Sequence, residues 1–165
     1  MMIERTENVK HKAILMLMYG CGLRLNEVTH LIPFDIDSKR MVVHLRRAKG
    51  KKDRDVHLPI RLLNCLREYF KVARPMTWLF EGQNIGEPYS DRSVQMVVKN
   101  AAKRAGIQRP VTAHMLRHSF ATHLLESGMD FRRLQEALGH ASIKTTEIYT
   151  HVTAEKIAFS PLDDL

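Results

Sequence analysis

Several features that mark other classes of protein are scarce in this chain. It has two cysteines, Cys21 and Cys65, which are too few for a disulfide framework and are typical of thiols in a reducing compartment. No apolar run reaches the length of a membrane span, and the first residues, MMIERTENVK, are too charged for a signal peptide. The sequence therefore indicates a cytoplasmic protein that has no membrane partner.

Internal repeats, low-complexity segments and linkers are also absent from the sequence, so its 165 residues are expected to form one domain. Hydrophobic residues make up 44% of the chain and charged residues 27%, which is the composition of a globular protein with a substantial core. This composition excludes a chain that is disordered or fibrous as a whole.

Basic residues outnumber acidic ones, and the net charge is +8. Residues 39 to 54 contain eight basic residues and one acid, and a second, acid-free patch covers residues 99 to 109. Such local positive charge favours a polyanion such as DNA or RNA, although a solvated basic face without a partner is the alternative. The side chains expected to bind DNA are Arg46, Arg47, Lys51, Lys52, Arg54, Lys99, Lys103 and Arg104.

Capping residues and helix breakers predict a mainly α-helical fold with a small antiparallel β-sheet. Helices are expected over residues 7–19 and 23–31, over 60–73, and after the capping residues Ser90 or Asp91, Thr112, Asp130 and Ser142. Short runs of β-branched residues between positions 42 and 58 predict the strands, with turns at DSKR and KGKKD. The second turn makes a basic hairpin tip that contains glycine.

One predicted helix carries polar residues that can do chemistry. His114 and Arg117 are three residues apart and leave the same face, whereas Leu116, Phe120 and Leu124 are expected in the core. The neighbouring residues His118 and His123 are expected to have structural roles.

Three further residues extend this set. Arg24 follows a glycine-rich break and could bind a phosphate, or it could pair with Glu27. Tyr149 could be a nucleophile if nearby cations such as His140 lower the pKa of its hydroxyl, or it could be a packing residue. Cleavage of a phosphodiester without a metal needs cationic donors, a nucleophile and an acid for the leaving oxygen, all of which the sequence offers.

Three segments, YGCGLRLNEV, AKGKKDRDVHLP and TAHMLRHSFATHLLESGMDFRRLQEALGHASIKTTEIYTHV, resemble the tyrosine site-specific recombinases of the phage integrase family. The similarity covers about residues 10 to 152 and is greatest to the Xer-like recombinases and the integrases of bacterial mobile elements. It implies the catalytic-domain fold of tyrosine recombinases. By position in these segments, the implied catalytic residues are Arg24, Lys49, His114, Arg117, His140 and Tyr149.

The resemblance also implies a mechanism. Tyr149 would attack DNA and form a 3′-phosphotyrosyl link. Lys49 would be the acid for the 5′ oxygen, and His114 would accept or donate the proton of the tyrosine hydroxyl. No metal or other cofactor is implied. The implied partners are double-stranded DNA and other recombinase protomers. The protein is expected to be a monomer when free and a tetramer on DNA. The implied location is the bacterial cytoplasm, at the nucleoid when the protein is active.

The resemblance divides the chain into a catalytic domain, residues 1–152, and a C-terminal tail, residues 153–165. The tail could dock onto a neighbouring protomer or onto its own domain, or it could be disordered. Family members usually carry a helical core-binding domain before the catalytic one. The resemblance implies that this chain begins almost at the catalytic domain, so that either it is an excised fragment or the core-binding half lies outside it. Weak DNA binding and little complete recombination are therefore expected of this chain alone.

Three other functions are compatible with parts of the pattern. A non-catalytic DNA-binding module of the same fold would have the same charge distribution. A metal-dependent nuclease could use His114, His118 and His123, although no carboxylate or cysteine accompanies them in the sequence. A type IB topoisomerase would use similar chemistry to relax supercoiled DNA without choosing a sequence.

Overall fold

The computed structural model describes residues 2–46, 53–84 and 86–139. In these residues the predicted fold class, mainly α with a small antiparallel sheet, is confirmed. The helices and strands, in chain order, are α1 (Val9–Gly20), α2 (Leu25–Thr29), the 3-10 helix η1 (Pro33–Asp35), β1 (Ile36–Asp37), β2 (Val42–Leu45), β3 (Arg54–His57), α3 (Ile60–Ala73), α4 (Asp91–Arg104), α5 (Ala113–Glu126) and α6 (Phe131–Leu138).

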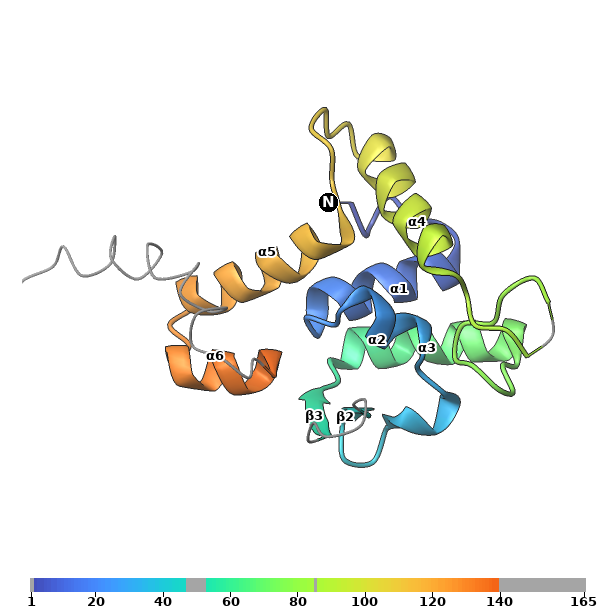
Figure 1. The fold of residues 1–165 in the computed structure, drawn as a ribbon, viewed down its shortest axis with the longest axis horizontal. Coiled ribbons are helices and arrows are strands. Elements are labelled where there is room, and N and C mark those ends of the chain that lie inside the picture. The colour runs from blue at the N-terminus through green and yellow to red at the C-terminus, as the bar shows by residue number, and fades with distance from the viewer. Residues whose placement is uncertain (1, 47–52, 85, 140–165) are drawn as a thin grey trace, which may run out of the picture.

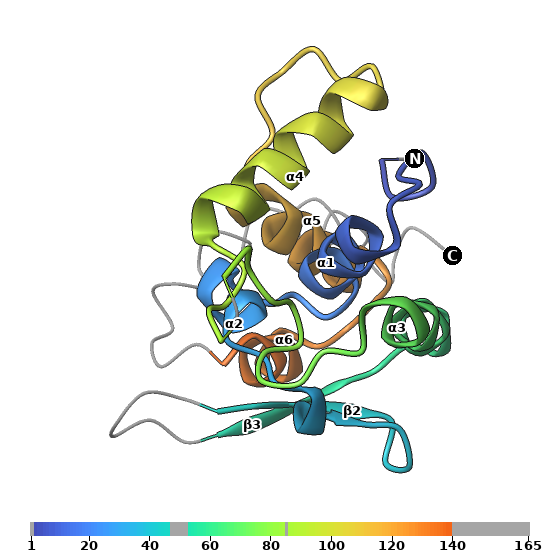
Figure 2. The ribbon, with the colours of Figure 1, turned by 90° about the vertical axis from the view of Figure 1, so that its right-hand side faces the viewer.

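Helix α1 is the centre of the main hydrophobic core, and α3, α4 and α5 surround it (Figures 1 and 2). Its middle residues are buried on nearly every side, including Ile14, Leu15, Leu17 and Met18. A helix that is apolar all round needs neighbours on all sides. The amphipathic helices α3 and α4 supply two of them and turn their polar faces outward.

Capping residues set the helix starts largely as the sequence predicts. Ser90 accepts the backbone N–H of Ser93, Thr112 that of Met115, and Asp130 those of Arg132 and Arg133. Asn8 accepts the N–H of His11, so α1 begins two residues later than expected. The helix expected after Ser142 lies outside the described residues.

The three strands form one antiparallel sheet in the order β1-β2-β3. Val43 pairs with Val56 and Leu45 pairs with Arg54. Because side chains alternate between the two faces of a strand, these four point to one face and His44 and Asp55 to the other. The inner face covers the helical core, and Figure 2 shows β2 and β3 lying along one end of the molecule.

Helix α5 belongs to two hydrophobic clusters. Leu116 lies in the main core, whereas Ala121 and Leu125 pack with Leu134 and Leu138 of α6 in a separate cluster. The predicted stripe of core residues is therefore right only at Leu116, because Phe120 and Leu124 are half-buried at the edge of the second cluster.

Both cysteines are free thiols, with Cys21 buried and Cys65 half-buried. The Cys21 thiol donates to the carbonyl of His57 at 3.3 Å, and burial raises the pKa of this thiol to about 12. In the described part of the chain, no helix has the length and apolar character of a membrane span.

The turn between α1 and α2 requires glycine at position 22. Gly22 has φ +63°, and a Cβ atom there would lie 2.4 Å from the ring of Phe120. Gly20, two residues earlier, would place its Cβ in open space. The close approach of α5 to this turn therefore depends on the absence of a side chain at Gly22.

We expect Gly22→Ala to lower the free energy of unfolding by about 2–4 kcal/mol, because it combines backbone strain with overlap onto Phe120. Gly20→Ala is the matched control and should change the stability by less than about 1 kcal/mol. Urea unfolding followed by circular dichroism measures both. Equal stabilities of the two variants would contradict this account of the turn.

Candidate active site

A single carboxylate, that of Glu27 in α2, lies at the centre of three guanidinium groups. Its side chain is 11% exposed, and its Oε2 accepts the backbone N–H of Arg24, the N-cap residue of α2, at 2.8 Å. The three arginines are Arg24, Arg54 and Arg117, and we refer to them as the arginine cluster.

Arg54 makes the shortest contacts with this carboxylate. Its Nη1 donates to Oε1 of Glu27 at 2.7 Å and its Nη2 to Oε2 at 3.0 Å, which is a two-point, end-on pair. The Arg54 side chain is 9% exposed. The position of Arg54 on the inner face of β3, two residues before the buried Val56, explains why it points inward.

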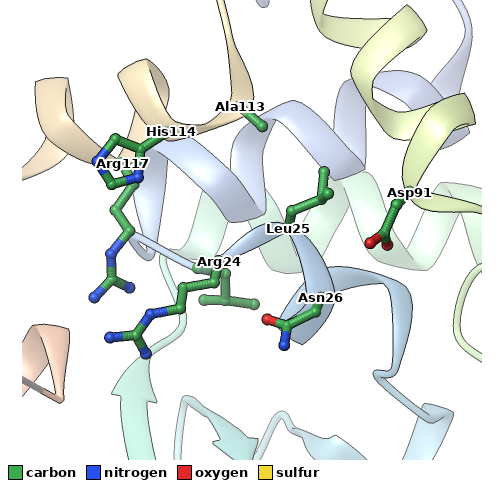
Figure 3. A pocket seen from close by; sticks show the side chains of 8 residues that line it. Arg24, Leu25, Asn26, Asp91, Ala113, His114 and Arg117 are labelled. Carbon is green, nitrogen blue, oxygen red and sulfur yellow. The ribbon is translucent and has the colours of Figure 1, made fainter.

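Arg24 is held more loosely and is the most exposed of the three. Its Nη1 lies 3.2 Å from Oε1 of Glu27, and 41% of its side chain is exposed. The pair with Glu27 that the sequence allows is therefore present, and Arg24 also lines a pocket, while its binding of a phosphate stays a prediction. Figure 3 shows its guanidinium reaching to the same side of the pocket as that of Arg117.

Arg117 is almost completely buried, with 4% of its side chain exposed. Its Nη1 donates to the carbonyl of Gly22 and lies 3.9 Å from Oε2 of Glu27, and its Nη2 donates to the carbonyl of Leu138 at 2.6 Å. One side chain on α5 thus connects the α1–α2 turn with the C-terminal end of α6.

The cluster keeps Glu27 ionised and leaves an excess of positive charge. Burial alone raises the pKa of the Glu27 carboxyl, but the hydrogen bonds from Arg54 and the Arg24 backbone, with the two arginine charges, lower it to about 2. Three guanidinium groups around one carboxylate carry a net charge of about +2.

The pocket beside the cluster has a volume of about 340 Å³. Arg24 and Arg117 contribute to its wall, and the exposed His114 from the first turn of α5 lies next to them (Figure 3). Fixed N–H donors and positive charge favour an oxyanion such as a phosphate group. The lining residues are Leu23, Arg24, Leu25, Asn26, Asp91, Ala113, His114 and Arg117.

A longer groove continues from this pocket. Its volume is about 1210 Å³, it runs between α4 and the segment before α5, and it shares His114 with the pocket. Lys99, Lys103 and Arg109 line it, and each is exposed. A groove of this volume with basic walls suits a nucleic-acid backbone.

A model of the phage integrase family matches residues 1–156. The chain belongs to the phage integrase family. Its relatives include tyrosine recombinase XerC 2 of Ralstonia nicotianae, 43% identical over 154 residues that cover 90% of this chain and 44% of the relative. Tyrosine recombinase XerA of Pyrococcus horikoshii is 40% identical over 154 residues, which cover 92% of this chain and 53% of the relative.

Solved structures of phage integrase family members have the same fold. The crystal structure of a XerA recombinase superposes with a TM-score of 0.84 at 32% identity, covering 95% of this chain and 60% of that one. A XerH site-specific recombinase bound to its difH substrate in a pre-cleavage complex gives a TM-score of 0.79 at 30% identity, covering 95% and 48%. The resemblance to tyrosine recombinases of the Xer type is thereby confirmed.

The chain spans about half the length of the curated relatives that it matches, from 44% to 60% for four of them. The family assignment therefore covers the part that these relatives share with the chain.

Of the six implied catalytic residues, the structure brings together Arg24, His114 and Arg117 around one pocket. The other three lie outside the described residues, as do three of the predicted DNA-binding residues. These six are Lys49, His140, Tyr149, Arg47, Lys51 and Lys52.

The remaining predicted DNA-binding residues differ in their surroundings. Lys99 and Lys103 line the groove. Arg46 is 54% exposed and pairs with the buried carboxylate of Asp35 at 2.6 Å. Arg104 is exposed and its Nη2 lies 3.4 Å from the hydroxyl oxygen of Thr6. Arg54 is nearly buried in the arginine cluster, a position unlike that of an exposed phosphate contact.

Sequence reasoning treated Glu27 only as an alternative partner of Arg24 and did not identify it as the centre of the site. A signal for the inward position of Arg54 was present, because Arg54 and the apolar Val56 are two residues apart on one strand. No local pattern indicated that Arg117 binds the carbonyls of Gly22 and Leu138.

The expected structural role of His123 is confirmed. Its Nδ1 lies 2.8 Å from the hydroxyl oxygen of Tyr19, and the two rings meet edge to face. In the part of the chain that the structure describes, no three His, Cys, Asp or Glu side chains form a group that could hold a metal ion.

Acid should lower the free energy of unfolding, because it protonates the Glu27 carboxylate. The folded-state pKa of about 2 lies below the ordinary 4.5, so the stabilisation, roughly 2–3 kcal/mol, is fully present above pH 4.5 and is lost as the pH falls toward 2. Urea unfolding between pH 7 and pH 3 should therefore show a steeper fall for wild type than for Glu27→Gln. Parallel curves for the two proteins would contradict a charged Glu27 at the centre of the cluster.

Proposed function

We propose that this member of the phage integrase family cleaves and rejoins double-stranded DNA, in site-specific recombination or integration, with Tyr149 as the nucleophile. The observation that carries the proposal is the convergence of Arg24, Arg117 and His114 on one pocket beside a net positive cluster. The basic groove that continues from this pocket supports a DNA backbone as the substrate. We also propose the cytoplasm, where bacterial DNA lies, as its location.

In this proposal the tyrosine oxygen attacks the phosphorus atom, and the bond from phosphorus to the 5′ oxygen breaks. The products are a 3′-phosphotyrosyl link and a 5′-hydroxyl group. His114 accepts the proton from Tyr149, Lys49 donates one to the 5′ oxygen, and His140 donates a hydrogen bond to the phosphate. A different 5′-hydroxyl can then attack the link, which regenerates the tyrosine and rejoins the strands.

Arg24 and Arg117 have different parts in this mechanism. Arg117 is fixed by two backbone carbonyls and a nearby carboxylate, so its charge is already in place before the substrate arrives. Arg24 is more exposed and can adjust to the phosphate oxygens. Preorganised positive charge of this kind stabilises the transition state at little reorganisation cost.

A larger assembly belongs to the proposal as well. The longer relatives have sequence beyond the region matched here, and we propose that an additional DNA-binding domain and further protomers are needed for complete recombination. Residues 1–152 would then supply the chemistry, and residues 153–165 would supply a docking segment.

The phosphotyrosyl link can be trapped on a library of nicked duplexes whose sequence around the nick is randomised. The short strand beyond the nick diffuses away after cleavage and prevents rejoining, so covalent adduct should accumulate with wild type and be absent with Tyr149→Phe. Denaturing gels and mass mapping of the modified peptide identify the adduct. Adduct at another residue, or none with wild type, would favour a different nucleophile or a non-catalytic DNA-binding module.

Neutralising the hairpin lysines should weaken DNA binding without changing its sequence preference. If Lys51 and Lys52 contact phosphates, changing both to alanine should reduce the slope of log affinity against log salt by about 2. Lys71→Ala is the control, because Lys71 pairs with Glu68 on the exposed face of α3. A slope that the double variant leaves unchanged would mean that these lysines do not contact the backbone.

A further inference from the structure

Arg54 and its neighbour Asp55 on β3 point to opposite faces of the sheet. Arg54 lies on the inner face, whereas Asp55 lies on the outer face and pairs there with Arg40 at 2.8 Å. The Arg40 side chain is 67% exposed and that of Arg54 is 9% exposed. Arg54 of β3 and Arg40 of the β1–β2 turn are thus each paired with a carboxylate, Arg40 in solvent and Arg54 in the interior.

The protein itself uses all three nitrogen atoms of the Arg54 guanidinium. Nη1 and Nη2 bind the two oxygens of Glu27, and Nε donates to the carbonyl of Ala137 at 3.3 Å. Ala137 is in the last turn of α6, one residue before the Leu138 carbonyl that Arg117 binds. These contacts hold the guanidinium between Glu27 and the end of α6, and Arg54 does not line the pocket that Arg24 and Arg117 line.

We propose that Arg54 is the counterion of Glu27 and thereby leaves Arg24 and Arg117 positive toward the DNA phosphate. Arg54 is then a positioning residue, not a DNA contact. This inference rests on the proposed function, because it assigns to the cluster the task of binding a reacting phosphate.

The distances support this division of roles. Arg54 contacts the carboxylate with two nitrogens at 2.7 and 3.0 Å, whereas the Arg24 guanidinium makes one contact at 3.2 Å and Arg117 lies at 3.9 Å. Without Arg54, one carboxylate would face only Arg24 and Arg117, and the net charge beside the pocket would fall from about +2 to about +1. The more exposed Arg24 would then turn toward Glu27 and away from the phosphate.

The effect of Arg54 on Glu27 agrees with this assignment. Among the favourable interactions that overcome the burial of Glu27 and lower its pKa to about 2, the hydrogen bonds from Arg54 contribute most. Glu27 also accepts the backbone N–H of Arg24 at the start of α2. It therefore has a structural role whether its carboxyl group is ionised or protonated.

A double-mutant cycle tests the proposal on the library of nicked duplexes described above. Arg54→Met should slow adduct formation at saturating DNA by about tenfold or more, since the carboxylate then opposes the positive charge that stabilises the transition state. Adding Glu27→Gln removes that opposing charge, and the double variant should regain at least about threefold of the rate. Arg40→Met, which breaks the solvent-exposed pair, should react at the wild-type rate.

Binding to a duplex of random sequence separates the proposal from direct DNA contact. If Arg54 is the counterion of Glu27, the slope of log affinity against log salt for Arg54→Met should equal that of wild type. If Arg54 contacts a phosphate, that slope should be smaller by about 1. The proposal is overturned by that reduced slope, by an Arg54→Met variant as fast as wild type, or by a double variant no faster than Arg54→Met.

The outcomes also separate this proposal from the proposed function. If wild type forms no covalent adduct, the proposed function is contradicted. The salt slope of Arg54→Met still shows whether Arg54 is a counterion of Glu27 or a DNA contact. If Arg54→Met does not fold, Arg54→Gln replaces it, because glutamine keeps a hydrogen-bond donor but loses the charge. A slower reaction of Arg54→Gln at an unchanged salt slope supports the proposal, and a wild-type rate overturns it.

Discussion

The site depends on one buried carboxylate that is shared among three guanidinium groups. A lone buried charge of either sign is costly, so Glu27 and the two nearly buried arginines stabilise one another only as a group. The group joins four parts of the chain: α2, β3, α5 and, through the carbonyls of Ala137 and Leu138, the end of α6. The excess positive charge beside the pocket follows from this arrangement, because one carboxylate cannot neutralise three arginines.

Much of the fold could be predicted from local signals. Ser90, Thr112 and Asp130 cap their helices as expected, and Gly139 ends α6 in the left-handed conformation. These signals act over a few residues, so a single sequence is enough to find them. Motif similarity then supplied Arg24, His114 and Arg117, which the structure places around one pocket.

The contacts that organise the site could not be predicted in the same way, because they join residues far apart in the sequence. Arg54 is 27 residues from Glu27, and Arg117 is 95 residues from Gly22. Basic residues near a charged hairpin are normally exposed, and charge counting therefore grouped Arg54 with the DNA-binding residues. Only the alternation of side chains along β3 distinguishes Arg54 from the exposed DNA-binding residues.

The double use of Arg117 has a consequence for how the site assembles. Four apolar side chains form the small cluster that holds α6 against α5, and the Arg117 hydrogen bond to Leu138 adds a polar link at the end of that helix. The same guanidinium lines the pocket, so the end of α6 helps to fix the positive charge that the pocket presents. The packing of α6 and the position of the charge beside the pocket are therefore thermodynamically linked, because a change that weakens the cluster between α5 and α6 also loosens the Arg117 guanidinium.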